Sequence, residues 1–144
     1  MTKKAWFKYL VKAQPHHTDY GGVVWHGTYL TWLETARVEC LQSVGVNFAD
    51  FVEMGCDLPV IEASLRYHLP ITLGMNVVVK TRLVEQKGVR IIWDYEIKSP
   101  DDQELYLTAK VVLVAIDRKK SKIMRKLPPL FQEALAKIKK IPLT

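Results

Sequence analysis

Four long β-rich runs follow one another in the second half of the chain, and they constrain the fold more than any other feature. Short turns separate them, with Gly74, Gly88 and the Pro-Asp-Asp of residues 100–102. Parallel neighbours need a crossover connection of a dozen or more residues, so these turns predict an antiparallel meander. The runs cover residues 58–68, 76–85, 89–99 and 105–117.

The first half contributes a strand over residues 5–13 and then one long helix. Apolar residues recur at spacings of three and four from Thr28, a plausible N-cap, to Gly45, a natural C-terminal stop. Shorter helices are predicted over residues 47–54 and 129–140. A long helix that is apolar on so many sides is most easily buried if the sheet curls around it. We therefore expect one α+β domain over residues 1–144.

The composition is that of an ordinary globular protein, with 144 residues, 49% hydrophobic and 25% charged. No apolar run approaches the roughly 20 residues that span a bilayer, and lysines interrupt the N-terminal apolar stretch. This predicts a cytoplasmic protein without an integral membrane contact. The cysteines and histidines lack metal-ligand spacing, so we expect neither a metal nor a cofactor.

A net charge of +6 is concentrated in residues 118–126 and 137–140. A basic patch can bind nucleic acid, an anionic membrane surface or a phosphorylated small molecule, although a solvated surface is the commonest case. The chain lacks a helix-turn-helix signature and a basic platform with interleaved aromatic residues. We therefore expect no nucleic-acid partner, while phosphates on a small ligand remain compatible with the charge.

The stretch HHTDYGGVVWHGT, residues 16–28, places one carboxylate and three glycines directly before the main helix. A helix N-terminus leaves backbone N–H groups unpaired and carries positive dipole charge. Glycines let backbone approach a ligand closely. Asp19 could then act as a base or nucleophile while the N–H groups hold a developing oxyanion, which is what acyl transfer needs.

Structural interpretations of the same residues are also open. Asp19 could be a turn residue that bonds its own backbone, and His26 a partly buried histidine satisfied by a carbonyl. Glu34 and Arg37 have the spacing of an i, i+3 ion pair. The tryptophans at positions 25 and 32 are expected in the core.

The run TDYGGVVWHGTYLTWLETAR resembles the hotdog-fold acyl-CoA thioesterases of the 4-hydroxybenzoyl-CoA thioesterase family, closest to a bacterial subgroup with the motif D-x-x-G-V-V-Y/W-H. The similarity covers about residues 5–126. It implies a single hotdog domain, in which a curved antiparallel sheet wraps one long central helix. It also implies a thioester hydrolase that converts acyl-CoA, with an aliphatic or aromatic acyl group, to the free acid and coenzyme A.

The resemblance assigns roles along this stretch. Asp19 takes the place of the catalytic aspartate, and the backbone N–H of His26, beside Gly27, takes the place of the donor that polarises the thioester carbonyl. The sequence departs from the family at His17, where an acidic or small residue is common, and at residues 75–76, where an aspartate is usual. We expect substrate contacts from Tyr20, Gly22, Val24, Trp25 and Tyr29.

Coenzyme A carries several phosphate charges, so we expect Lys87, Arg90, Arg125 and Lys126 to contact them. Long strands leave edges that a second subunit could cover, which predicts a homodimer or homotetramer. Two other functions stay open: a hotdog hydratase or dehydratase that pairs His26 with Glu34 or Glu62, and a non-catalytic acyl-binding protein.

Overall fold

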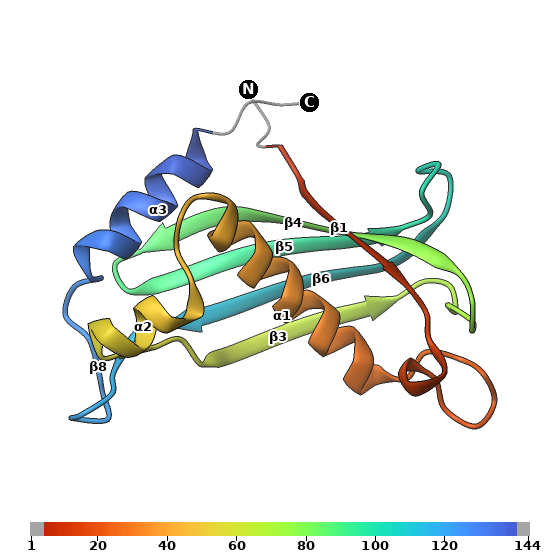
Figure 1. The fold of residues 1–144 in the computed structure, drawn as a ribbon, viewed down its shortest axis with the longest axis horizontal. Coiled ribbons are helices and arrows are strands. Elements are labelled where there is room, and N and C mark those ends of the chain that lie inside the picture. Colours follow the sequence, from red (N-terminus) through yellow and green to blue (C-terminus); the bar gives the residue numbers. More distant parts are fainter. Residues whose placement is uncertain (1–4, 141–144) are drawn as a thin grey trace.

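The structure, a computed structural model, describes residues 5–140. Its main element is an antiparallel five-stranded sheet in the order β1-β4-β5-β6-β3 (Figure 1). Burial follows the pleat of the strands, because every second residue along β5 faces the core while its neighbours are half-buried. The strands are β1 (Phe7–Lys12), β3 (Val60–Tyr67), β4 (Asn76–Lys87), β5 (Arg90–Lys98) and β6 (Leu105–Val114).

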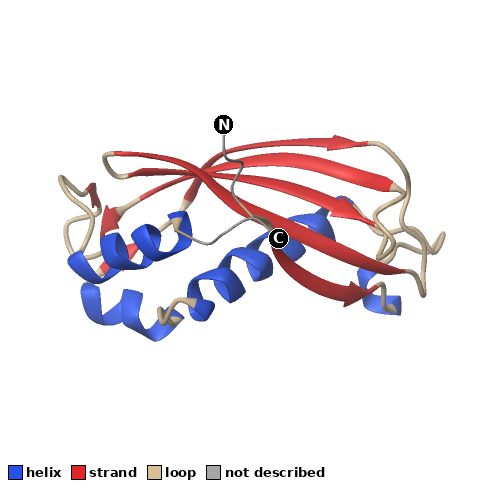
Figure 2. Ribbon diagram, turned by 90° about the horizontal axis from the view of Figure 1, so that it is seen from above, coloured by secondary structure: helices blue, strands red, loops and turns tan. Residues whose placement is uncertain are grey.

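One long helix, α1 (His26–Ser43), lies across the concave face of this sheet. Figure 2 shows α2 (Phe48–Met54) and α3 (Pro129–Lys139) on the same side of the sheet as α1. Side chains at helical spacing turn one face of α1 into the core, so the predicted α+β architecture is confirmed. The buried residues of α1 are Thr28, Tyr29, Trp32, Leu33, Ala36, Arg37, Cys40 and Leu41.

The strand order corrects the predicted meander. β4, β5 and β6 are consecutive neighbours, but β3 pairs with β6 and not with β4. The connection over residues 68–75 therefore passes across the ends of two strands. It is anchored on the way, because Ile71 is fully buried and the N–H groups of His68 and Leu69 bond the carbonyl of Tyr106. Such a crossing depends on contacts distant in sequence, which turn composition does not reveal.

Most element boundaries agree with the predictions to within two residues, but the start of α1 does not involve a Thr28 cap. The helix begins at His26 with Trp25 as its N-cap, and Thr28 lies inside the first turn. The second helix ends at Gly55 in a left-handed conformation, as a C-terminal glycine favours. A small sheet was not predicted because its strands are only two residues long: β2 (Cys56–Asp57), β7 (Ile116–Asp117) and β8 (Lys122–Ile123).

The described part of the chain contains no helix long and apolar enough to cross a membrane.

The distance between α1 and the sheet depends on a small residue. Ala36 is completely buried in the middle of the helix, so a larger side chain there has to push α1 away from the strands. We expect Ala36→Leu to lower the free energy of unfolding by about 1–3 kcal/mol. Gln42→Leu, on the exposed side of the same helix, is the matched control and should have little effect. Chemical denaturation measures both; an unchanged Ala36→Leu midpoint would show that α1 has room to spare.

Candidate active site

The loop before α1 is held in place by backbone hydrogen bonds at both of its ends. Within the loop, Thr18 and Val24 form an isolated β-bridge, and the N–H of Asp19 bonds the carbonyl of Val23 at 2.9 Å. The N–H of Val24 bonds the carbonyl of Ile71 at 2.8 Å, which ties the loop to the connection between β3 and β4. Asp19 therefore sits on a fixed backbone.

The carboxylate of Asp19 closes the turn that follows it. Its Oδ1 accepts hydrogen bonds from the N–H groups of Gly21 at 2.8 Å and Val23 at 3.3 Å. Gly22 has a φ of +77°, a conformation that favours glycine. Asp19 is thus a turn residue that bonds its own backbone, as one interpretation predicted, but these hydrogen bonds involve only Oδ1. Among residues 5–140, Oδ2 has no hydrogen-bond partner, and the side chain is exposed.

The N-terminus of α1 offers unpaired donors close by in the chain. Trp25 makes no side-chain cap, and the N–H of Thr28 bonds the carbonyl of Trp25 at 3.0 Å. Within the described residues, the N–H groups of His26 and Gly27 have no acceptor. Helix geometry gives them none inside α1, and the helix dipole adds positive charge there. An oxyanion at this end would accept from these two groups.

Thr28 and His17 connect the loop to the helix. The hydroxyl of Thr28 donates to the carbonyl of His17 at 2.9 Å, and the N–H of Trp25 reaches the same oxygen at 3.4 Å. The imidazole of His17 packs edge-on against Trp32, with 5.2 Å between ring centroids. Thr28 therefore links α1 to the loop through a side-chain hydrogen bond and is not the N-cap that its position predicted.

Two of the residues expected to contact substrate, Tyr20 and Trp25, are at the surface of this junction. Tyr20 is fully exposed, whereas the ring of Trp25 covers Gly27 and meets the imidazole of His26 edge-on, at a centroid distance of 5.2 Å. A Cβ at position 27 would lie 2.3 Å from the Trp25 ring, so the Trp25 side chain would have to move to make room for any larger residue. Trp25 is about half-exposed, which corrects its expected place in the core, while Trp32 is buried as predicted.

Val24 and Tyr29, which were also expected to contact substrate, are buried. Burial raises the pKa of the Tyr29 hydroxyl, opposed by a hydrogen bond from the backbone of Ile71. The ring of Tyr29 packs against Trp32 and Tyr67 at centroid distances of 5.9 and 5.4 Å. Their contact with substrate stays a prediction.

The four basic residues proposed for coenzyme A are not brought to Asp19 within one protomer. The loop of Asp19 bridges to Thr72, just before β4 begins, whereas Lys87 ends that strand. Eleven residue steps along a strand correspond to about 36 Å. Arg90 begins β5 at the same far end, and residues 125–126 follow β8, also at the opposite end of the molecule from the loop (Figure 1).

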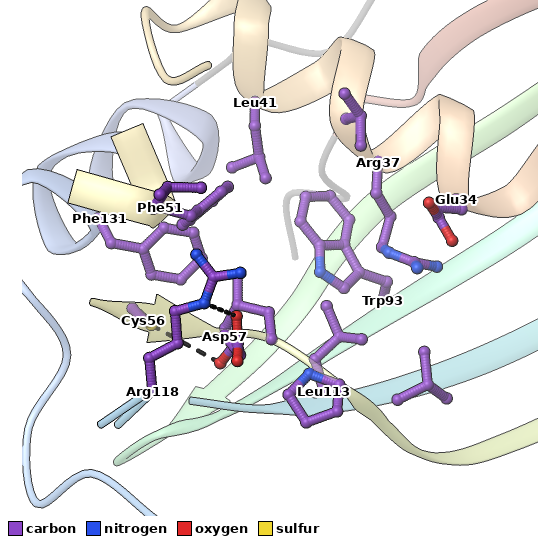
Figure 3. A pocket seen from close by; sticks show the side chains of 15 residues that line it. Glu34, Arg37, Leu41, Phe51, Cys56, Asp57, Trp93, Leu113, Arg118 and Phe131 are labelled. Atoms are coloured by element: carbon purple, nitrogen blue, oxygen red, sulfur yellow. Dashed lines mark hydrogen bonds and ion pairs between the residues drawn. The ribbon is translucent and has the colours of Figure 1, made fainter. Parts of the chain in front are cut away.

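Sequence reasoning missed a cavity of about 270 Å³ between α1, α2 and the inner face of the sheet (Figure 3). The predicted ion pair between Glu34 and Arg37 is not found among the described residues. Arg37 is buried and donates from Nη1 to the hydroxyl of Tyr95 at 2.9 Å. The sequence did contain one signal: position 37 falls at helical spacing from Leu33, Cys40 and Leu41, all on the buried face.

Comparison with known proteins identifies the family of the chain. The model of the Thioesterase-like superfamily matches residues 13–138. Sll0410 of Synechocystis sp., a candidate esterase, is 58% identical over 134 residues, covering 93% of this chain and 81% of sll0410. YneP of Bacillus subtilis, a candidate acyl-CoA thioesterase, is 30% identical over 125 residues, which are 85% of this chain and 90% of YneP.

Solved structures show the same architecture. Slr0204 from Synechocystis, a 1,4-dihydroxy-2-naphthoyl-CoA thioesterase, superimposes with a TM-score of 0.83 at 25% identity, over 92% of this chain and 96% of its own. The DHNA-CoA thioesterase of Staphylococcus aureus gives 0.84 at 29% identity, over 93% and 91% of the two chains. The fold is therefore the hotdog fold, and the chain is a thioester hydrolase. It belongs to the Thioesterase-like superfamily.

His17 makes the stability of the loop sensitive to pH. Burial, and then the charge of His16, lower the pKa of His17 from 6.5, and its Nδ1 accepts the N–H of Gln14 at 2.9 Å. The imidazole of His17 therefore binds a proton more tightly in the unfolded chain than in the folded one. The folded state loses stability as the pH falls through 6.5 towards the lowered pKa. We expect the melting midpoint of the wild type to fall more than that of His17→Gln between about pH 7.5 and about pH 5.5. Equal falls in the two proteins would contradict this.

Proposed function

We propose that the chain hydrolyses acyl-CoA to a free acid and coenzyme A at the junction of the Asp19 loop and α1. The observation that carries the proposal is the loop of Asp19 directly before α1: within residues 5–140, one oxygen of this carboxylate has no hydrogen-bond partner, and the first two N–H groups of the helix have no acceptor. YneP and the two structural neighbours bear names of acyl-CoA thioesterases, which supports this substrate class. The cytoplasmic location stays a prediction.

In the proposed reaction, the N–H groups of His26 and Gly27 donate hydrogen bonds to the thioester oxygen and stabilise the negative charge that develops on it. Asp19 acts on the carbonyl carbon in one of two ways. As a base, it removes a proton from a water molecule, whose oxygen attacks the carbon. As a nucleophile, it attacks directly to form a mixed anhydride that water then hydrolyses. In both cases the C–S bond breaks and the thiolate of coenzyme A leaves and takes up a proton.

The geometry does not favour a hydratase that uses His26. Glu34 lies eight residues further along α1, about 12 Å from His26 at the rise of an α-helix. Glu62 belongs to β3 and is exposed, as His26 is. A histidine and a carboxylate that act on one substrate need to approach the same carbon, so Glu34 does not form this pair with His26 within a protomer.

We also propose that the enzyme assembles as a homodimer through the edge of β3. This strand ends the five-stranded sheet, and seven of its eight residues are exposed. Val60, Ile61 and Tyr67 leave 46%, 46% and 53% of their surface exposed. An apolar edge with free backbone groups is a template for another strand. A homotetramer would need a second contact in addition to this one.

The separation of the basic residues from Asp19 bears on the same proposal. Lys87 and Arg90 lie about 36 Å from the loop, measured along β4. If they or residues 125–126 bind the phosphates of a coenzyme A held at Asp19, they do so from the second subunit. The phosphate assignment therefore depends on the dimer and stays a prediction.

The role of Asp19 is tested by Asp19→Asn. The asparagine oxygen can still accept from Gly21 and Val23, so the turn and the melting midpoint should be kept, but the amide can neither take a proton nor attack. We expect kcat to fall about a hundredfold or more. Asp117→Asn is the matched control, because Asp117 Oδ1 also accepts two backbone N–H groups, from Lys119 and Lys120, both at 3.0 Å.

Thiol release from acyl-CoA measures kcat in both variants, and thermal unfolding measures the midpoint. Full turnover by a folded Asp19→Asn protein would reduce Asp19 to a turn residue. If neither the wild type nor the variants released thiol, the result would instead favour a non-catalytic acyl-binding protein.

The dimer is tested by introducing a charge on β3. We expect wild-type protein to scatter light as about twice its 16.6 kDa, and Ile61→Glu to shift this mass towards the monomer. Ile123→Glu is the control, since Ile123 is an exposed isoleucine on β8, away from the β3 edge. An active wild-type monomer at micromolar concentration, or equal effects of the two substitutions, would refute the β3 interface.

A further inference from the structure

The cavity behind α1 has apolar walls, but two buried hydrogen-bond donors belong to it. Apolar side chains make up most of its lining, among them Leu41 of α1, Phe51 of α2, Leu113 of β6 and Phe131 of α3. Trp93 of β5 also lines it, as Figure 3 shows. A volume of about 270 Å³ is close to the lower end of small-molecule pockets.

The first donor is the indole N–H of Trp93. The side chain is 1% exposed, and its Nε1 is fully buried with no hydrogen-bond partner among the described residues. Most buried polar groups in proteins are paired, so an unpaired one calls for an explanation. Trp32 carries the other such nitrogen of the described chain, but Trp32 does not line this cavity.

The second donor is the guanidinium of Arg37, which is 9% exposed. Within residues 5–140, its one hydrogen bond goes to the Tyr95 hydroxyl, and no carboxylate lies within ion-pair distance of it. Burial raises the pKa of Tyr95 to about 12, against the opposing charge of Arg37, so this partner is neutral. An arginine has five N–H donors, which leaves several without a described acceptor.

The other charges of the lining indicate that the missing acceptor is uncharged. Arg118 is already paired with Asp57 at 3.1 Å, and Glu34 offsets the charge of Arg37 without contacting it. The lining therefore has no net formal charge. A carboxylate in this pocket would meet Glu34 and Asp57, whereas a keto or hydroxyl oxygen would accept from Trp93 or Arg37 without that repulsion.

We propose that this pocket binds the distal part of the acyl group and selects an acyl chain that carries an uncharged oxygen acceptor. The inference rests on the proposed thioesterase activity and adds its substrate class. Arg37 lies eleven residues beyond His26 on α1, about 16 Å along the helix. A thioester held at the start of α1 in the same protomer therefore needs a long chain to bring its oxygen to these donors.

The test compares acyl-CoA substrates of equal chain length. One series is unsubstituted, one carries a single keto or hydroxyl group at successive positions, and one ends in a carboxylate. For the wild type we expect kcat/KM of at least one keto or hydroxyl substrate to exceed that of the unsubstituted chain by about tenfold or more, because a plain chain leaves the donors unpaired. The carboxylate series should gain nothing.

Two matched variants distinguish the effect of the pocket on substrate preference from the general effect of losing an indole. Trp93→Phe keeps an aromatic ring and removes the donor, so the preference for the oxygenated chain should fall to about twofold or less. Trp32→Phe removes the other unpaired indole N–H, outside the pocket, and should keep the ratio whatever it does to the rate. Calorimetric binding of the matching free acids gives the same comparison without catalysis.

The outcomes distinguish this inference from the proposed activity. If the wild type hydrolyses acyl-CoA but favours the plain or carboxylate chain, the pocket assignment is wrong and the activity stands. If Trp93→Phe keeps the wild-type ratio, Trp93 does not select the substrate, which also overturns the inference. If no thioester is hydrolysed, the proposed activity fails, and equal binding of plain and oxygenated acids then overturns the pocket as well.

Discussion

The burial of α1 against the concave face of the sheet is the contact on which the rest of the structure depends. Fully buried Ala36 allows the helix to lie close to the strands, and the inward residues of β5 complete the core beneath it. The N-terminus of α1 then emerges where the chain crosses from β3 to β4. Because the bond from Val24 to Ile71 ties the loop to that crossing, packing of the helix and placement of Asp19 are consequences of one arrangement.

Asp19 illustrates how one side chain can serve structure and chemistry together. Oδ1 holds the turn by accepting two N–H groups, and Oδ2 has no partner among the described residues. A carboxylate that is oriented through one oxygen loses little freedom when the other oxygen takes part in a reaction. The turn and the catalytic interpretations, which the sequence presents as alternatives, are therefore compatible with each other.

The sequence predicts what is local and fails where distant segments meet. The helix start, the glycines and Asp19 lie within ten residues of one another, so motif and helix physics were enough to bring them together. The place of β3 beside β6 depends on a crossing that no turn residue marks. Arg37 was assigned to an ion pair with Glu34 because their spacing permits one. In the structure, Arg37 is instead buried and bonds Tyr95, which is 58 residues away in the sequence.

The pocket and the sheet edge meet at Val60. This residue begins β3, is 46% exposed and also lines the cavity behind α1. A strand added to the β3 edge by a second protomer would therefore lie beside the pocket and exclude water from its mouth. Hydrogen bonds from buried donors discriminate strongly between ligands only where water cannot substitute for the missing acceptor. On these proposals, the preference for an oxygenated acyl chain belongs to the assembled dimer and weakens in any variant that remains monomeric.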